Sequence, residues 1–342
     1  MRGALFLAIV LNSALLAAGA PVSPFNGLSI EVKDDGTAYA FLISGHFYGS
    51  SSSRSGLPAA TVLAERELFS SSGASFLLTT GDLFINTKAD LARHRRVFYD
   101  QLGIPVFNAV GNHDLDGGDY EALLGPTSFA FDVGPDRFVV LDTERDDGRI
   151  IGRQAELLFE ATELARQGRI RNLFVISHRP VWAEVQPMFD GMFEHNTRSV
   201  LAQGPGPGVL EALDAAAAGA GVFWFAGSMG GGAPASILWQ VMPSGVVYGM
   251  SAVRDEPRDA LLLVSVDDDG VHPEALSLTG RELPEVEDLD VAYWRSKQGV
   301  PQPFNWRLLP LNTWNVISDR AFWWGMAAML VMSMLLRRIV RR

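Results

Sequence analysis

The stretch Gly111-Asn112-His113-Asp114, together with the run that precedes it, decides the fold class of this chain. Residues 104–110, Ile-Pro-Val-Phe-Asn-Ala-Val, are mostly apolar and predict a buried strand. The polar tetrapeptide begins where that strand ends. In open α/β sheets, ligands bind beyond the carboxyl ends of the strands. The tetrapeptide is therefore predicted to belong to a functional site at one edge of a sheet.

The same arrangement occurs at two other places in the chain. Residues 76–80, Phe-Leu-Leu-Thr-Thr, precede Gly81-Asp82, and residues 174–177, Phe-Val-Ile-Ser, precede His178. Both runs read as buried strands that end in a polar residue. A carboxylate, a carboxamide and imidazoles at strand ends suit hard or borderline divalent metals together with a proton donor.

Periodicity predicts alternating strands and helices around these motifs. Such alternation is typical of a layered α/β domain. The predicted helices cover residues 58–70, 91–102, 154–167 and 210–218. The remaining predicted strands cover residues 39–43, 138–141, 222–226, 237–241, 246–253, 261–266 and 275–278.

Taken in order, Gly81-Asp82, Gly111-Asn112-His113-Asp114 and His178-Arg179-Pro180 resemble the motifs of the calcineurin-like metallophosphoesterase superfamily. The resemblance covers about residues 38–280. It implies an α/β fold in which two packed mixed β-sheets are flanked by helices. It also implies a metal-dependent hydrolase whose substrate is a phosphoester.

The resemblance assigns a role to each motif residue. Asp82 is expected to bridge two metal ions, and Asn112 and His178 are expected to bind the second of these ions. His113 is expected to be the general acid that protonates the leaving-group oxygen. Asp114 is expected to orient His113 through a carboxylate–imidazole hydrogen bond.

The first motif of the family, Asp-x-His after the first strand, is altered in this chain. Ser44-Gly45-His46 follows the predicted strand 39–43. In one register His46 is the family's histidine, and Ser44, a neutral and weak ligand, replaces the aspartate. In a second register residues 44–49 align with Ser-Asp-x-His-x-Gly, and both ligands are lost. The first register keeps an imidazole at the strand end, so His46 is included among the candidate metal ligands.

The last motif of the family, Gly-His-x-His, is replaced by Gly227-Ser228-Met229-Gly230. Both of its imidazoles are absent. The first ion then keeps only Asp82 and His46, whereas the second keeps Asp82, Asn112 and His178. Three protein ligands plus water hold a divalent ion, and two seldom do. The ligand count therefore favours one divalent ion (Mn, Fe, Zn or Ca) over two.

The altered motifs leave two functions open. One is a phosphoester hydrolase with an atypical metal site. The other is a catalytically inactive protein that keeps the metallophosphoesterase fold as a binding or scaffold module. Retention of His113, which is useful chiefly for chemistry, favours the enzyme.

Composition narrows the classes of partner. The net charge is −11, and all 39 acidic residues lie between the two termini. Such a negative field opposes nucleic-acid binding, so no nucleic-acid partner is expected. There is no cysteine, which excludes disulfides, thiolate metal sites and cysteine nucleophiles.

Both ends of the chain carry apolar segments. Residues 1–20 have a charged start, an apolar stretch and small residues at the end, as in a secretory signal peptide. Residues 321–340 place tryptophans at one edge and arginines at the other, which predicts one transmembrane helix. Between them, we expect a phosphoesterase domain over residues 30–280 and an irregular juxtamembrane linker over residues 281–320. Aromatic residues in this linker suggest docking on the domain or on the membrane surface: Trp294, Phe304, Trp306 and Trp314. These segments predict a single-pass cell-membrane protein whose domain lies on the extracytoplasmic side.

Overall fold

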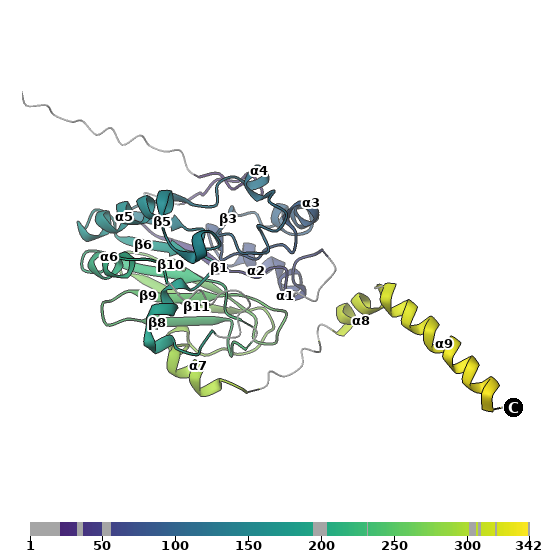
Figure 1. Cartoon of the computed structure of the whole chain (residues 1–342). Helices are drawn as coiled ribbons and strands as arrows, with labels where there is room; N and C mark the ends of the chain where they lie inside the picture. Colours follow the sequence, from purple (N-terminus) through teal and green to yellow (C-terminus); the bar gives the residue numbers. More distant parts are fainter. Residues whose placement is uncertain are drawn as a thin grey trace, which may run out of the picture.

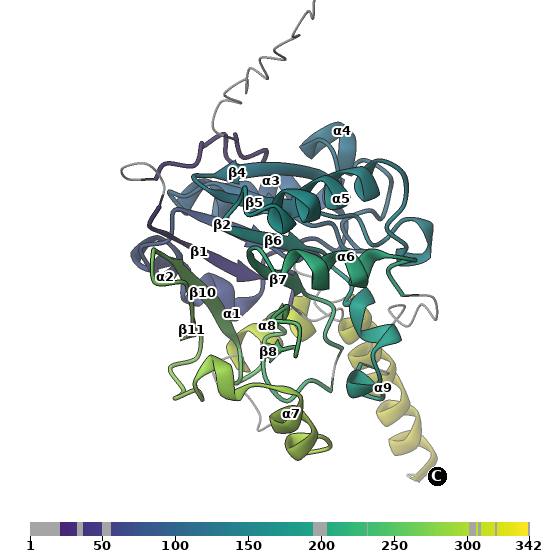
Figure 2. The same ribbon diagram turned by 90° about the vertical axis from the view of Figure 1, so that its left-hand side faces the viewer.

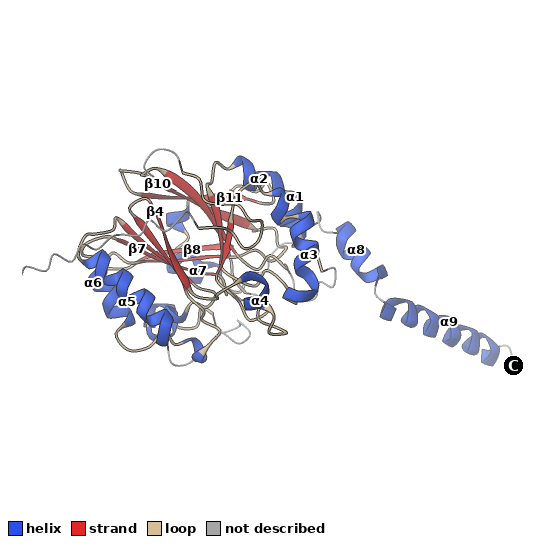
Figure 3. Ribbon diagram, turned by 90° about the horizontal axis from the view of Figure 1, so that it is seen from above, coloured by secondary structure: helices blue, strands red, loops and turns tan. Residues whose placement is uncertain are grey.

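A computed structural model describes residues 21–32, 37–49, 56–193, 204–230, 232–300, 306, 309–318 and 320–340. Its domain consists of two mixed β-sheets with helices on both outer faces, as seen in Figures 1 and 3. The fold class expected from the resemblance is therefore confirmed. The predicted signal peptide, residues 1–20, lies outside the described residues.

The five-stranded sheet has the order β11-β10-β1-β2-β3. Its strands β1, β2 and β3 are parallel, so their carboxyl ends lie at one edge of the sheet. Strand β10 pairs antiparallel with β1, and β11 pairs antiparallel with β10. The bounds are β1 (Tyr39–Ser44), β2 (Phe76–Thr79), β3 (Val106–Asn108), β10 (Ala260–Val266) and β11 (Val271–Ser277).

The six-stranded sheet has the order β4-β5-β6-β7-β9-β8. Strands β5, β6, β7 and β9 are parallel, and antiparallel strands β4 and β8 form the two edges. Every predicted strand overlaps an observed one, whereas β4 was not predicted. The bounds are β4 (Phe129–Val133), β5 (Asp136–Val140), β6 (Asn172–Ile176), β7 (Gly221–Ala226), β8 (Ile237–Val241) and β9 (Val247–Ser251).

Helices cover the outer faces of both sheets (Figure 3). Helices α1 (Ala60–Ala64), α2 (Arg66–Ser71) and α3 (Thr87–Val97) lie over the five-stranded sheet. Helices α5 (Gly152–Arg166) and α6 (Val209–Ala216) lie over the six-stranded sheet, and the short α4 (Tyr120–Leu124) follows the β3 loop. The helix predicted at 58–70 is divided in two, because the backbone at Glu65 leaves helical geometry.

Aromatic side chains fill the space between the two sheets. Phe41 and Phe76 of one sheet stack with ring centroids 5.2 Å apart, and Phe138 and Phe174 of the other stack at 4.8 Å. Phe41 meets Phe138 and Phe174 edge-on at 5.3 and 5.1 Å. Leu42, the neighbour of Phe41, belongs to the apolar cluster beneath α1–α3. This period-two alternation holds the sheets together and brings their parallel strand ends to one side.

The first half of the predicted linker packs onto the domain. Helix α7 (Val291–Lys297) lies beside β8, as Figure 2 shows. Trp294 is buried, and its indole Nε1 donates to the Ile237 carbonyl at 3.1 Å. The Asp290 carboxylate caps the helix by accepting from the Tyr293 amide at 2.8 Å. Composition suggested an irregular segment here, but the buried indole makes it part of the folded unit.

The C-terminal helices stand away from the sheets (Figure 1). They are α8 (Leu309–Ser318) and α9 (Arg320–Val340). An 18-residue window within Arg320–Ile339 has a mean hydropathy of 1.2, and none of this window is buried against the protein. By length and composition, α9 can cross a membrane.

The buried His94 should make the fold acid-sensitive. The ring is 1% exposed, packs 5.0 Å from the Phe84 ring, and burial followed by the Arg93 charge lowers its pKa to about 3. The unfolded chain takes up a proton near pH 6.5 that the native state takes up only near pH 3. Between pH 6.5 and pH 3, this difference in proton uptake by His94 therefore lowers the free energy of unfolding by about 1.4 kcal/mol for each pH unit.

We expect His94→Phe to remove this slope, which denaturant unfolding between pH 6 and pH 4 would measure. The matched control is His272→Gln at an exposed position, which should follow the parent. Parallel curves for parent and His94→Phe would contradict the prediction.

Candidate metal centre

The candidate site lies where the carboxyl ends of the parallel strands from both sheets meet. His46 follows β1 and Asp82 follows β2, and the His46 amide donates to the Gly81 carbonyl at 2.8 Å. His178 follows β6 in the other sheet. Its Nδ1 lies 2.7 Å from the Thr80 carbonyl oxygen, directly after β2. This contact joins the two sheets at the site.

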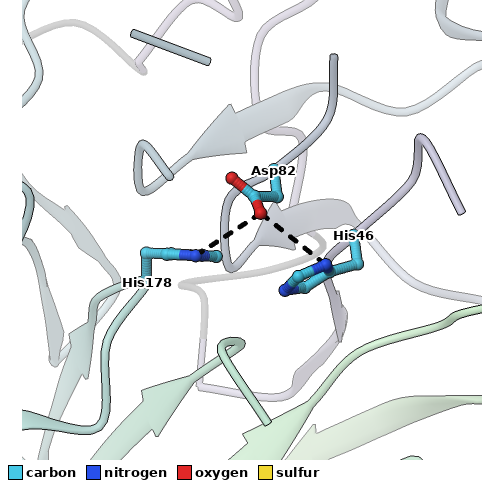
Figure 4. A group of neighbouring side chains, drawn as sticks. All are labelled: His46, Asp82 and His178. Atoms are coloured by element: carbon cyan, nitrogen blue, oxygen red, sulfur yellow. Dashed lines mark ion pairs between the residues drawn. The ribbon is translucent and has the colours of Figure 1, made fainter. Parts of the chain in front are cut away.

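Three side chains converge at this edge, as Figure 4 shows. His46 Nδ1 and His178 Nε2 each lie 3.7 Å from Asp82 Oδ2, and all three donor atoms lie within 4.8 Å of one another. The three residues are at most 4% exposed. Tetrahedral ligands with bonds of about 2.0–2.1 Å are roughly 3.3 Å apart. Closing the observed cluster around one ion therefore requires the two Asp82 contacts to shorten by about 0.4 Å and the two imidazole nitrogens to approach each other by up to about 1.5 Å.

Several polar atoms at the cluster lack a hydrogen-bond partner. Among the residues that the structure describes, His46 Nδ1 and Nε2, His178 Nε2 and the Ser44 hydroxyl are buried without a hydrogen bond. Such orphaned groups are rare in native proteins. The Thr80 carbonyl accepts from His178 Nδ1–H, which leaves the Nε2 lone pair directed at Asp82. A divalent cation fits this donor set.

Electrostatics also suits a cation. Burial lowers the pKa of His46 to about 3, against the opposing charge of Asp82, so its imidazole is neutral and can donate a lone pair. Burial opposes ionisation of Asp82, but His178 and His46 outweigh it and lower its pKa. Burial also opposes protonation of His178, but Asp82 raises its pKa overall. A metal ion and a proton would therefore compete for His178 Nε2.

The backbone at the site is strained and closely packed. His46 and Asp82 have φ angles of 57° and 59°, in the left-handed region that costs non-glycine residues about 1 kcal/mol or more. A Cβ at Gly81 would lie 2.6 Å from both the Ala109 carbonyl oxygen and His178 Nδ1. Only glycine therefore allows the strand ends to approach this closely.

The altered last motif also lies at the site. The Gly227 and Ser228 amides both donate to the His178 carbonyl at 2.9 Å, and Ser228 is buried. The loop in which the resemblance expects the last motif, residues 227–230, therefore lies beside His178. A Cβ at Gly227 would lie 2.4 Å from the Thr80 carbonyl oxygen, so this glycine too is required by close packing.

The loop after β3 places Asn112 and His113 at the rim of the cluster. Both are half-buried. The His113 amide donates to Asp82 Oδ1 at 3.1 Å, and its ring centroid lies 4.9 Å from that of Tyr48. His113 is thus beside the cluster and partly open to solvent. The metal-ligand role of Asn112 and the acid role of His113 remain predictions.

Asp114 lies in a different environment from the one expected. Its carboxylate accepts five hydrogen bonds, of 2.7–3.2 Å, from the backbone amides of Asp82, Leu83, Phe84 and Gly111 and from Asn108 Nδ2. Within the described residues it makes no hydrogen bond to the His113 ring. Burial, then the Asp82 charge, raises the pKa of Asp114 to about 6, so near neutral pH it is ionised and can accept all five bonds. Asp114 holds the two site loops together.

Two further residues at the site were not found from the sequence. Tyr48 is buried between two site histidines, with its ring centroid 5.6 Å from that of His46. Arg254 is half-buried beyond β9, and its charge contributes to the lowered pKa of His46. The neighbouring Val253 amide donates to the Gly45 carbonyl at 3.0 Å. Tyr48 is two residues from His46, which was a usable signal, whereas nothing in the sequence connects Arg254 to the site.

No family model matches the sequence, and no curated protein matches it. Among solved structures, 38 chains match the fold. A purple acid phosphatase from yellow lupin (Lupinus luteus) seeds matches with a TM-score of 0.51 and 9% sequence identity. The match covers 78% of this chain and 54% of the lupin chain. A predicted phosphoesterase from Streptococcus pneumoniae TIGR4 has a TM-score of 0.34 and 9% identity, covering 72% and 94%.

This chain therefore spans about half the length of the lupin phosphatase. At this identity the likeness concerns the fold alone. It supports a metallophosphoesterase-type fold, in agreement with the resemblance of the motifs.

The two roles discussed for Asp114 predict different mutant behaviour. Asp114→Ala leaves several buried N–H groups without an acceptor, so we expect a loss of about 3 kcal/mol or more in the free energy of unfolding. His113→Ala, at a half-buried rim position, should change it by less than about 1 kcal/mol. Denaturant unfolding of both variants measures this difference. If Asp114→Ala were as stable as the parent, this would contradict the structural role and favour the role of orienting His113.

Proposed function

We propose that this protein is a membrane-anchored, extracytoplasmic phosphoester hydrolase that uses one divalent metal ion. The observation that carries the proposal is the buried His46–Asp82–His178 cluster with its orphaned imidazole nitrogens. It is supported by the strand-end position of the cluster in a metallophosphoesterase-type fold. Among the described residues, these imidazole nitrogens have no hydrogen-bond partner that would compensate for their burial, whereas a bound metal ion would.

The proposed ion would be held by His46, Asp82 and His178, with Asn112 as a further candidate. Imidazole and carboxylate ligands suit Zn, Fe or Mn better than Ca, which prefers oxygen ligands throughout. When bound, the ion supplies Lewis-acid polarisation of the phosphoryl group and activation of the attacking water. The Thr80 carbonyl keeps His178 in the tautomer that presents Nε2.

The residues at the rim supply the other parts of the proposed reaction. His113 would donate a proton to the leaving-group oxygen. Arg254 adds local positive charge beside His46. This matters because the net charge of the chain is −11, so an anionic phosphoester is attracted only by local groups. The left-handed backbone at His46 and Asp82 is typical of a functional site.

The proposed location depends on the two ends of the chain. Helix α9 would span the membrane, with the arginines that follow its apolar part on the cytoplasmic side. The signal-peptide pattern of residues 1–20 would place the domain on the opposite side.

One observation favours a second function, a catalytically inactive binding or scaffold protein. Ser44 and Ser228 are buried, and the resemblance, in the register that keeps His46, puts them where the family has an aspartate and a histidine. With neutral groups there, less positive charge can be held at the site than in a two-metal centre. Metal content and hydrolysis together distinguish the two functions.

Metal content is the first test. We expect the full-length protein, purified in detergent and loaded separately with Zn, Mn or Fe, to retain about one equivalent. Asp82→Ala should retain none, because it removes the carboxylate central to the cluster. The control is Asp268→Ala, whose side chain is 89% exposed. Equal metal content in the parent and Asp82→Ala would contradict the proposed centre.

Leaving-group dependence tests the role of His113. An alkyl phosphate needs a proton on its leaving oxygen, whereas a p-nitrophenyl ester does not. We expect His113→Asn to lower kcat about 10²-fold or more for the alkyl ester, far less for the p-nitrophenyl ester, and to leave metal content unchanged. Equal losses for both esters would argue against a general acid. No hydrolysis of either ester by metal-loaded parent would favour the inactive module.

A further inference from the structure

A second cavity lies away from the metal centre. It has a volume of about 220 Å³ and lies between strands β8, β10 and β11 and the segment 281–300, here called the docked segment. No residue of the His46–Asp82–His178 cluster and none of the loop after β3 lines it. The cavity is therefore separate from the candidate metal centre.

Basic side chains predominate among the charged residues of its wall. Arg258, Arg281 and Lys297 line the cavity, against one acidic residue, Glu282. This balance is the reverse of that in the whole chain, where 39 acidic residues face 28 basic ones. In the described residues, neither Arg281 nor Lys297 forms an ion pair. Lys297 Nζ lies 5.8 Å from the centre of the Tyr293 ring, which also lines the cavity.

Arg258 is the buried member of this group, with only 6% of its surface exposed. Its Nη1 donates to the Ser236 hydroxyl at 2.9 Å, and its Nε lies 2.7 Å from Glu256 Oε2. Its Nη2 is buried and has no hydrogen-bond partner within the described part of the chain. The nearby Asp259 carboxylate accepts from the Thr61 hydroxyl and the Arg254 amide, at 2.8 and 3.0 Å.

Most of the remaining wall is apolar. Ile237, Ala260 and Leu289 line the cavity and are almost completely buried. An apolar wall lowers the local dielectric constant, which strengthens the attraction between a cation and an anion. A ligand that fits this wall has an anionic group and a small apolar body.

We propose that this cavity binds a small organic oxyanion, a carboxylate or a phosphate that bears a short apolar group. A guanidinium matches the planar geometry of these anions, and Arg281 and Lys297 attract them to the entrance. The volume is smaller than the roughly 300–1,000 Å³ of sites for drug-sized ligands, which restricts the occupant to a few carbon atoms.

Binding would also hold the docked segment in place. Leu289, Tyr293 and Lys297 belong to this segment, whereas Arg258 and Ile237 belong to the domain. An anion between them contacts both. Because it would bind the native state only, it would raise the unfolding temperature by an amount that grows with the logarithm of the ratio of its concentration to its Kd.

The test uses butyrate, butyl phosphate and inorganic phosphate as probes. Calorimetry and thermal unfolding are measured on the full-length protein in detergent, after chelation has removed metal so that the metal centre does not bind the anions. We expect at least one of the organic probes to bind and raise Tm. If only butyrate binds, the cavity is a carboxylate site. If only butyl phosphate binds, it is a phosphate site. Binding of none, or of inorganic phosphate only, would overturn the proposal.

Two variants locate the binding. Arg258→Gln removes the buried charge, and Ala275→Leu fills the cavity from a partly exposed position on β11 without changing a charge. Both should weaken binding at least tenfold. The control Arg153→Gln alters a side chain that is 72% exposed on α5 and should bind as the parent does. If Arg258→Gln does not fold, Ala275→Leu and Lys297→Glu decide the result.

Asp82→Ala separates this site from the metal centre. It should bind the organic probes as tightly as the parent, because Asp82 does not line the cavity. Loss of binding in Asp82→Ala, or unchanged binding in Ala275→Leu, would overturn the assignment. Since these measurements use metal-free protein, their outcome is independent of whether the proposed hydrolase is active.

Discussion

The hydrogen bond between His178 Nδ1 and the Thr80 carbonyl is the contact on which the candidate site depends. It joins the strand ends of the two sheets and sets the imidazole tautomer. It forms only because Gly81 and Gly227 let the backbones approach more closely than any Cβ allows. The aromatic core between the sheets maintains the same approach over the length of the strands.

The residues around this contact differ in role: some hold the loops in position, and others are candidates for the chemistry. Asp114 uses its full carboxylate to hold two loops, which leaves the neighbouring His113 at the rim and partly open to solvent. Asp82 Oδ1 accepts from the His113 amide of the same loops, so the carboxylate is fixed beside His46 Nδ1 and His178 Nε2, two nitrogens without a hydrogen bond in the described part of the chain. Ser44 and Ser228, buried near this cluster, offer only neutral groups, in keeping with the proposal of a single ion.

The docked segment gives the region before helix α9 a structural role. Trp294 anchors it to β8 through both burial and a hydrogen bond, and it forms one wall of the basic cavity. The same segment leads along the chain to α8 and α9. A ligand in the cavity would therefore act on the part of the chain that connects the domain to the proposed membrane anchor.

The sequence by itself determined the strands, the α/β class and the motif residues, because apolar runs and the polar residues that end them are local patterns. It also indicated the apolar C-terminal helix. Only the tertiary structure brought His46 to Asp82 and His178, gave Asp114 its five donors, and placed Arg254 and Trp294. These depend on contacts between residues distant in sequence. A local pattern shows that a polar side chain ends a strand, whereas its partners are decided by how the two sheets pack.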